Sequence, residues 1–254
     1  MLIFDIETGP LPDEILKAQF VFEDPPPPGE FIETAVKIGN LKDPTKIKEK
    51  IESAKAAHEK AVAEHSDNVA AMRTEAWREL LDGAALSHFT GQMLAIGYKS
   101  TESGKWAIHG EDAAKGEDEV KLLAGFWDVY NNNRHKKRRM CGFNISGFDL
   151  PFLIHRSWIH SLDVPTGVYP PPAHRYLDSA MFVDLAERWQ CGQRNVFTKL
   201  DVICKALGIG GKPDGVSGKD FAKLWVSDRA KAEEYLLNDL NMTEALATRM
   251  GILA

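Results

Sequence analysis

Apolar residues dominate the start of the chain and predict a buried strand there. The segment from Met1 to Thr8 is apolar except for Asp5 and Glu7, and it ends at Gly9-Pro10, where a strand would stop. Side chains on a strand alternate between its two faces, so Asp5 and Glu7 should point the same way, about 6–7 Å apart. Two carboxylates on an apolar strand destabilise it unless a partner offsets their charge. The pattern therefore indicates a site on the first strand.

Helical periodicity dominates the stretch from about residue 43 to residue 83. Apolar positions recur every three or four residues among Lys and Glu, with a turn predicted at Ser66-Asp67-Asn68 and a stop at Gly83. This pattern predicts a helical hairpin inserted between the first and second strands. Its charges are typical of a solvated structural appendage, and an arm that guides substrate or contacts a partner is the alternative.

Strands and helices are mixed through the rest of the chain, which predicts an α/β domain. Strand-like runs occupy residues 92–98, 105–109, 139–143 and 180–184, and helices are predicted over 117–130, 197–207 and 228–250, with another starting near residue 149 or 150. Segments rich in Pro or Gly at 169–172 and 208–218 are predicted loops. No repeat or linker divides the chain, so residues 1–254 are expected to form one domain that carries the insertion.

Composition changes this picture little. The chain has 254 residues, of which 44% are hydrophobic, and a formal net charge of -6, which argues against a protein that coats nucleic acid through bulk charge. No apolar run approaches the roughly 20 residues of a membrane span, and the first residues do not resemble a signal peptide. The three cysteines form neither a zinc pattern nor a disulfide framework, so a reducing, cytoplasmic location is expected.

Two further acidic segments lie in the second half of the chain. Asp149 follows a strand and a turn and stands near the start of a helix, where an N-cap aspartate is a common structural feature. Tyr235 and Asp239 lie four residues apart on a predicted helix, so they share one face. Each segment alone carries little information about function.

In order and spelling, the three segments together resemble the exonuclease motifs of the DEDD superfamily. These motifs read Asp-x-Glu on the first strand, Asn-x-x-x-Phe-Asp before a helix, and Tyr-x-x-x-Asp on a late helix. The chain is similar in particular to stand-alone relatives of the proofreading domain of family B DNA polymerases, over residues 1–9 and from 91 to the C-terminus. The histidine subtype has a histidine five residues before the last aspartate. Glu234 stands there instead, which indicates the tyrosine subtype.

The resemblance implies an RNase H-like mixed sheet flanked by helices and assigns roles to eight residues. Two Mg²⁺ or Mn²⁺ ions would be bound by Asp5, Glu7, Asp149 and Asp239. Tyr235 would orient the attacking water. The last nucleotides of a single-stranded 3′ end would contact Thr8, Asn144 and Phe148.

The chemistry agrees with this resemblance, because four carboxylates suffice to hold two hard divalent ions for phosphodiester hydrolysis. We therefore expect a 3′–5′ exonuclease that favours DNA over RNA. One alternative is a catalytically silent nucleic-acid-binding or scaffolding module with the same fold. Another is a phosphoesterase that acts on small nucleotides. The basic run from Arg134 to Arg139 could contact phosphates or be a solvated turn, and Lys212 is a weaker candidate for a substrate contact.

Overall fold

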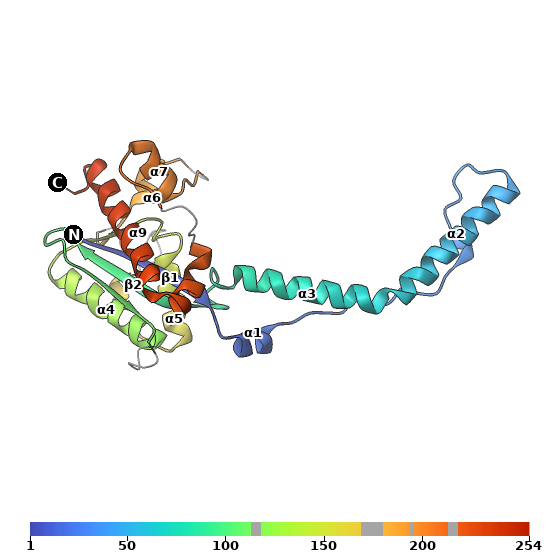
Figure 1. Ribbon diagram of the computed structural model, residues 1–254, viewed down its shortest axis with the longest axis horizontal. Helices are drawn as coiled ribbons and strands as arrows, with labels where there is room; N and C mark the ends of the chain where they lie inside the picture. Colours follow the sequence, from blue (N-terminus) through green and yellow to red (C-terminus); the bar gives the residue numbers. More distant parts are fainter. Residues whose placement is uncertain (113–117, 169–179, 194–195, 213–217, 254) are drawn as a thin grey trace. The chain divides into compact units, whose positions relative to one another are not determined.

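The computed structural model describes residues 1–112, 118–168, 180–193, 196–212 and 218–253. It divides into two compact units, one of residues 1–13 and 84–254 and one of residues 14–83 (Figure 1). The strands are β1 (Leu2–Pro10), β2 (Gly91–Ser100), β3 (Trp106–Gly110), β4 (Met140–Gly142) and β5 (Phe182–Asp184). The helices are α1 (Asp13–Gln19), α2 (Pro44–Ala63), α3 (His65–Ala84), α4 (Glu119–His135), α5 (Asp149–Ile159), α6 (Leu185–Gln190), α7 (Leu200–Leu207), α8 (Phe221–Ser227) and α9 (Arg229–Arg249), with short 3-10 turns at Glu33–Ala35, Thr166–Val168 and Gly218–Asp220.

A mixed sheet forms the centre of the first unit. In the described part of the chain its strand order is β3-β2-β1-β4-β5. β1 pairs antiparallel with β2 and parallel with β4, while β3 and β5 extend the two edges. β1 is therefore central, so the strand that carries Asp5 and Glu7 has neighbours on both sides.

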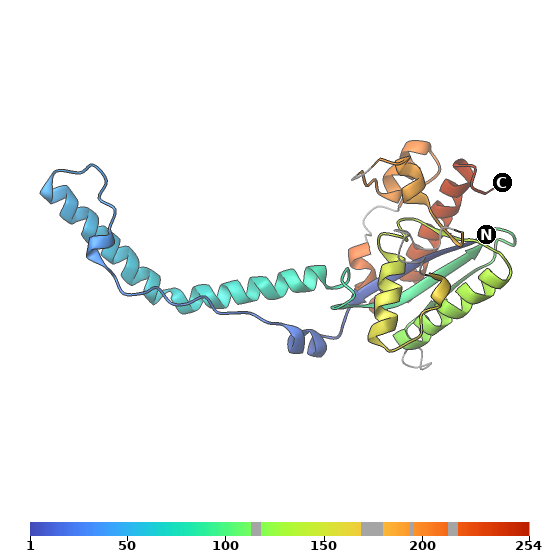
Figure 2. The same ribbon diagram turned by 180° about the vertical axis from the view of Figure 1, so that it is seen from behind.

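Helices cover both faces of this sheet, as the sequence predicts (Figure 2). On one face Phe4 and Ile6 pack with apolar side chains of α4 and α5 in a single core cluster. On the other face Ile3 packs with residues of α7 and α9, and Ala95 packs with residues of α8 and α9. Asp5 and Glu7 alternate with Phe4 and Ile6 along β1, so they belong to the α9 face.

The second unit is helical, but it does not contain the predicted hairpin. α2 and α3 run end to end and are separated only by Glu64, which keeps a right-handed helical backbone (φ -90°, ψ 0°) (Figure 1). Because this residue does not reverse the chain, no antiparallel pair forms. The predicted turn at Ser66-Asp67-Asn68 is wrong, since these residues lie in the first turn of α3.

An extended segment before α2 packs along the two helices instead. The ring of Phe20 meets Trp77 edge-on at 5.3 Å between centroids, and Asp24 accepts a hydrogen bond from Arg73 at 2.6 Å. Further along, the ring of Phe31 lies 5.6 Å from His58. The unit thus begins about thirty residues before the predicted insertion.

The other sequence predictions agree with the structure to within a few residues, except that α4 extends five residues beyond its predicted end. Residues Arg134 and His135 close α4, and the remainder of the basic run leads into β4. The predicted loop at 169–172 lies outside the described residues. Among the described helices, none combines the length and the apolar character needed to cross a bilayer.

Candidate active site

A close approach of α9 to the sheet brings two acidic segments together. Asp5 of β1 is paired with Gly97 of β2. A Cβ atom at Gly97 would lie only 2.8 Å from Leu240 Cδ1 and 3.1 Å from Leu236 Cγ, both on α9. The glycine therefore lets the helix settle directly above the carboxylates of β1, and Asp239 lies on the turn of α9 that faces them.

Three of the four predicted ligands form one cluster. Asp5, Glu7 and Asp239 each offer a carboxylate oxygen, and these oxygens lie within 4.8 Å of one another. Asp239 is 6% exposed and Glu7 is 9% exposed, so little water screens their charges. The same-face geometry predicted for Asp5 and Glu7 is present.

The fourth residue, Asp149, approaches from the α5 side of the same strand. It is the first residue of α5, and its Oδ1 atom accepts a hydrogen bond from the backbone N–H of Ile6 at 3.2 Å. Asp149 is therefore not an N-cap, because Phe148 occupies that position and makes no capping hydrogen bond. After burial, Asp149 is the largest cause of the raised pKa of Asp5, ahead of Asp239 and Glu7.

Burial holds the pKa values of all four carboxyls above their ordinary range, and repulsion from nearby carboxylates adds to it. Burial is the largest cause for Asp5 and Glu7, and the adjacent carboxylates add to it. Burial likewise raises the pKa of Asp149 to about 7 and raises that of Asp239. In addition, Asp239 Oδ1 is buried without a hydrogen-bond partner among the described residues. A divalent cation would satisfy this oxygen and relieve the repulsion, so the donor set fits hard metal ions.

These shifts predict that the metal-free protein loses stability as the pH rises from about 4 to about 7. The folded state holds the Asp149 proton more tightly than the unfolded chain does, so both states are protonated below pH 4 and the unfolded chain ionises first above it. Each pKa unit of difference corresponds to about 1.4 kcal/mol.

The melting temperature measured against pH in chelator should therefore fall more steeply for the wild type than for Asp149→Asn, which has no proton to lose. Mg²⁺ or Mn²⁺ added at pH 8 should raise the wild-type melting temperature, because ligands that bind the folded state stabilise it. Parallel pH curves for the two proteins would contradict this origin of the effect.

Tyr235 joins the cluster from α9 and has a cationic neighbour. Its side chain is buried, and its hydroxyl accepts a short hydrogen bond from Lys212 Nζ, which also donates to Asp239 Oδ2 at 2.6 Å. Burial, followed by the charge of Asp239, raises the pKa of Tyr235 to about 12. The phenol therefore stays protonated near neutral pH and can orient a water molecule, but it is a poor base.

Lys212 is the residue whose importance the sequence understated. Burial alone would lower its pKa, but the Asp239 carboxylate outweighs this effect and raises it, so the ammonium group stays charged. Its loop reaches the site because its N–H donates to Asp201 Oδ1 at 2.6 Å and because Gly211 leaves room beside Asp201 and Lys205. In the sequence only the run Gly-Gly-Lys drew attention to Lys212. A loop has no periodic pattern, so the sequence could not predict where the Lys212 side chain lies.

Asp184 shapes the loop that leads to Asp149. Its two carboxylate oxygens accept hydrogen bonds from the N–H groups of Asn144 and Ser146, both at 2.8 Å, and it also caps α6 through Ala186. Asn144 adopts a left-handed backbone with φ 61°. Two bonds to one buried aspartate thus hold the turn that precedes α5.

The three predicted substrate contacts differ in their surroundings. The Thr8 hydroxyl donates to the carbonyl of Ala85 at 2.6 Å and is buried. The Asn144 side chain lies over Gly147, where a Cβ atom would approach its Oδ1 within 2.5 Å. The Phe148 ring is half-buried and lies 5.6 Å from Phe152. Thr8 and Phe148 therefore already have protein partners, and their contact with substrate stays a prediction.

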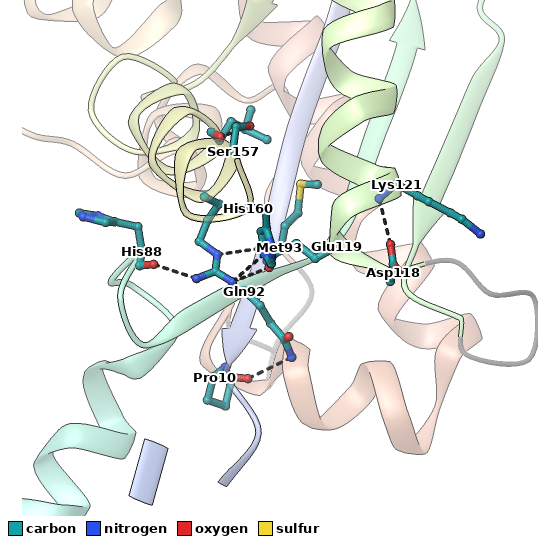
Figure 3. Close-up of polar contacts among 11 residues, drawn as sticks. Pro10, His88, Gln92, Met93, Asp118, Glu119, Lys121, Ser157 and His160 are labelled. Atoms are coloured by element: carbon teal, nitrogen blue, oxygen red, sulfur yellow. Dashed lines mark hydrogen bonds and ion pairs between the residues drawn. The ribbon is translucent and has the colours of Figure 1, made fainter. Parts of the chain in front are cut away.

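A buried ion pair anchors the far end of α5 (Figure 3). Arg156 donates to both carboxylate oxygens of Glu119, at 2.9 and 2.5 Å, and to the carbonyl of His88 at 3.1 Å. Glu119 also accepts from the N–H of Met93 at 2.8 Å and contacts His160 Nε2 at 2.8 Å. The network ties α4, α5 and β2 together, so it fixes the helix whose first residue is Asp149.

Comparisons with known proteins concern the fold and the family of the chain. Uncharacterized protein MJ0365 of Methanocaldococcus jannaschii is 31% identical over 120 residues, which span 46% of this chain and 61% of that relative. The family B DNA polymerase from the hyperthermophilic archaeon Pyrobaculum calidifontis is similar with a TM-score of 0.54 at 17% identity, over 66% of this chain and 23% of the polymerase. At this identity the likeness concerns the fold, and it confirms the expected RNase H-like architecture.

A family match covers most of the unit that contains the carboxylates. Residues 86–250 match the family described as predicted 3′-5′ exonuclease related to the exonuclease domain of PolB. The matched span includes Asp149, Tyr235 and Asp239, and it begins just after the helical unit ends at Gly83. The chain therefore belongs to this family of predicted 3′–5′ exonucleases.

Proposed function

We propose that this protein is a metal-dependent exonuclease that hydrolyses phosphodiester bonds at the 3′ end of single-stranded nucleic acid. The observation that carries the proposal is the cluster of Asp5, Glu7 and Asp239 on one face of the sheet, with Asp149 beside it. Three buried carboxylates and a half-buried one, all with raised pKa values, have no structural benefit in a silent module, because they destabilise the fold that holds them.

Each residue has a role in this proposal. Asp5, Glu7, Asp149 and Asp239 hold two divalent ions, Mg²⁺ or Mn²⁺. When bound, such ions lower the pKa of an attacking water and stabilise charge on the leaving 3′ oxygen. The Tyr235 hydroxyl orients that water, and the Lys212 ammonium beside it offsets negative charge of the phosphate. This is the tyrosine subtype of the DEDD arrangement.

The substrate follows from the same features. A single strand can bring its terminal phosphodiester to the carboxylates without unpairing, and in this proposal Phe148 and Asn144, which lie close to Asp149 in the chain, contact its last bases. We favour DNA over RNA because the family is described by its relation to the exonuclease domain of a polymerase. The free cysteines Cys141, Cys191 and Cys204 are consistent with a cytoplasmic location.

The decisive test uses a single-stranded DNA oligonucleotide labelled at its 5′ end and its RNA counterpart. Each is incubated with the purified protein in Mg²⁺, in Mn²⁺ and in chelator. Shortening of the labelled strand one nucleotide at a time from the 3′ end, only with metal, is the expected result. Absence of cleavage of both polymers in either metal would refute the exonuclease, and binding without cleavage would favour the silent module.

Tyr235→Phe is expected to lower kcat about 10- to 100-fold with a change in KM of less than about threefold. The substitution removes only the hydroxyl that orients the water, while the carboxylates remain, and positioned hydrogen bonds of this kind contribute on that scale. Steady-state kinetics on the labelled oligonucleotide measures both constants. Phe221→Leu, a change in the aromatic neighbour of Tyr235 that keeps the hydroxyl, is the matched control and should retain most of the wild-type kcat. An unchanged kcat in Tyr235→Phe would remove the hydroxyl from the mechanism.

A further inference from the structure

A concave site lies on the face of the sheet opposite the carboxylates. It is a hollow of about 310 Å³ between α4 and the paired strands β2 and β3. It is lined by Ile96, Tyr98, His109, Lys121, Leu122, Gly125 and Val129. Ile96 and Tyr98 pair with Ile6 and Phe4, which face α4, so the sheet separates the hollow from Asp5 and Glu7.

A glycine within α4 keeps this hollow open. Gly125 is the seventh residue of the helix, and a Cβ atom built on it meets no heavy atom within 4 Å. Glycine is a poor helix former in a helix interior, so nearly any other residue would favour α4 and fill part of the space. The hollow thus depends on Gly125, and the stability of α4 does not explain why a glycine stands there.

A buried polar atom belongs to the lining. Tyr98 is 8% exposed, and its hydroxyl has no hydrogen-bond partner among the described residues. Its ring meets the ring of His109 edge-on at 6.1 Å between centroids. A buried hydroxyl without a partner is unfavourable, whereas a bound molecule with one polar atom would satisfy it as donor or acceptor. The other buried wall residues, Ile96 and Leu122, are apolar.

We propose that the hollow binds a small aromatic molecule that presents one hydrogen-bonding atom to the Tyr98 hydroxyl. Its volume lies at the lower end of small-molecule sites, which begin near 300 Å³, and a cavity about half as large already accommodates benzene. One or two rings therefore match the space. Among the buried lining residues the Tyr98 hydroxyl is the polar group, while the exposed His109 and Lys121 complete the lining, so the buried part of the hollow favours a ring with one polar atom. This site goes beyond the exonuclease function and does not depend on it.

The experiment uses the full chain and two probes of the same size and shape, phenol and toluene, which differ by one hydroxyl. Titration calorimetry, with ligand-observed NMR for weak binding, should show that the wild type binds both probes saturably. Tyr98→Phe should weaken phenol about five- to tenfold, the value of one hydrogen bond, and change toluene less than about twofold. Equal effects on the two probes would overturn the assignment of Tyr98.

Gly125→Leu should abolish binding of both probes, because its side chain fills the hollow. The matched control is Ala124→Leu, which adds the same side chain at the exposed neighbouring position outside the lining and should bind as the wild type does. Gly125→Ala, which adds one methyl group, should weaken both probes partially and serves if the leucine variant does not fold. Failure of the wild type to bind either probe, or phenol binding that survives Gly125→Leu, would refute the site.

Discussion

Asp5→Asn is expected to abolish hydrolysis and to raise the melting temperature of the metal-free protein. Asp5 lies within the carboxylate cluster, and Asp149, Asp239 and Glu7 all add to the rise of its pKa. The amide cannot supply the anionic ligand that a divalent ion requires, so a loss of about 10³-fold or more in kcat/KM follows from several kcal/mol of lost transition-state stabilisation. The same change removes a negative charge that the neighbouring carboxylates repel, which stabilises the metal-free protein.

Kinetics in Mg²⁺ and thermal unfolding in chelator measure the two effects separately. Asp128→Asn, the same chemical change at an exposed position of α4, is the matched control and should alter neither. Metal ions should raise the melting temperature of the wild type more than that of Asp5→Asn. If Asp5→Asn unfolds at a lower temperature than the wild type in chelator, Asp5 stabilises the fold instead of destabilising it. This result would contradict the ligand role.

Glu119→Gln is expected to lower the free energy of unfolding by about 3–5 kcal/mol, the usual cost of leaving one charge of a buried ion pair without its partner. Glu119 and Arg156 are 5% and 3% exposed, so water cannot replace the lost carboxylate. The effect should also reach the active site, since Arg156 holds α5 and Asp149 begins it. Denaturant unfolding at pH 7 measures the loss.

An exposed ion pair provides the control for this substitution. Glu102 accepts from Arg138 at 2.8 Å but is 58% exposed, so Glu102→Gln should cost less than about 1 kcal/mol. The pH dependence of the free energy of unfolding distinguishes the loss of the ion pair from a packing defect. Burial would raise the pKa of Glu119, but hydrogen bonds from Arg156, Met93 and His160 outweigh it and lower the pKa.

The charged Glu119 carboxylate therefore stabilises the folded state fully at a pH above the ordinary pKa of glutamate. This stabilisation is lost as the pH falls through the lowered pKa of Glu119 in the folded protein. The difference between the wild type and Glu119→Gln should accordingly shrink below about pH 4. A constant difference down to pH 2 would instead indicate a packing defect.

The spacing of apolar residues predicted most of the first unit, because it shows which face of each strand or helix is buried. The apolar start of the chain predicted β1, and the helical spacing near the C-terminus predicted α9 to within one residue at each end. The same reasoning failed at residues 66–68. Ser, Asp and Asn favour turns, but they also favour the first turn of a helix, and in this chain they begin α3.

The candidate site shows the same division between local and distant information. The alternation of β1 placed Asp5 and Glu7 on one face, and the helical spacing placed Tyr235 with Asp239. The contact between those two pairs depends on Gly97, whose missing side chain lets α9 approach. The hydrogen bonds of Lys212 to Tyr235 and Asp239 span 23 and 27 residues and leave no periodic trace in the sequence.

The sequence by itself determined the five strands and the helices α4, α5, α7 and α9 of the exonuclease unit, but not the short helices α6 and α8. It also determined the face of β1 that carries Asp5 and Glu7 and the order of the three motifs, because each follows from spacing within one element. Only the tertiary structure decided that Lys212 neutralises Asp239, that Arg156 and Glu119 anchor α5, and that Gly125 leaves a hollow beside Tyr98. These features depend on how elements pack across distances in the chain, and packing is set by shape and burial that no single segment contains.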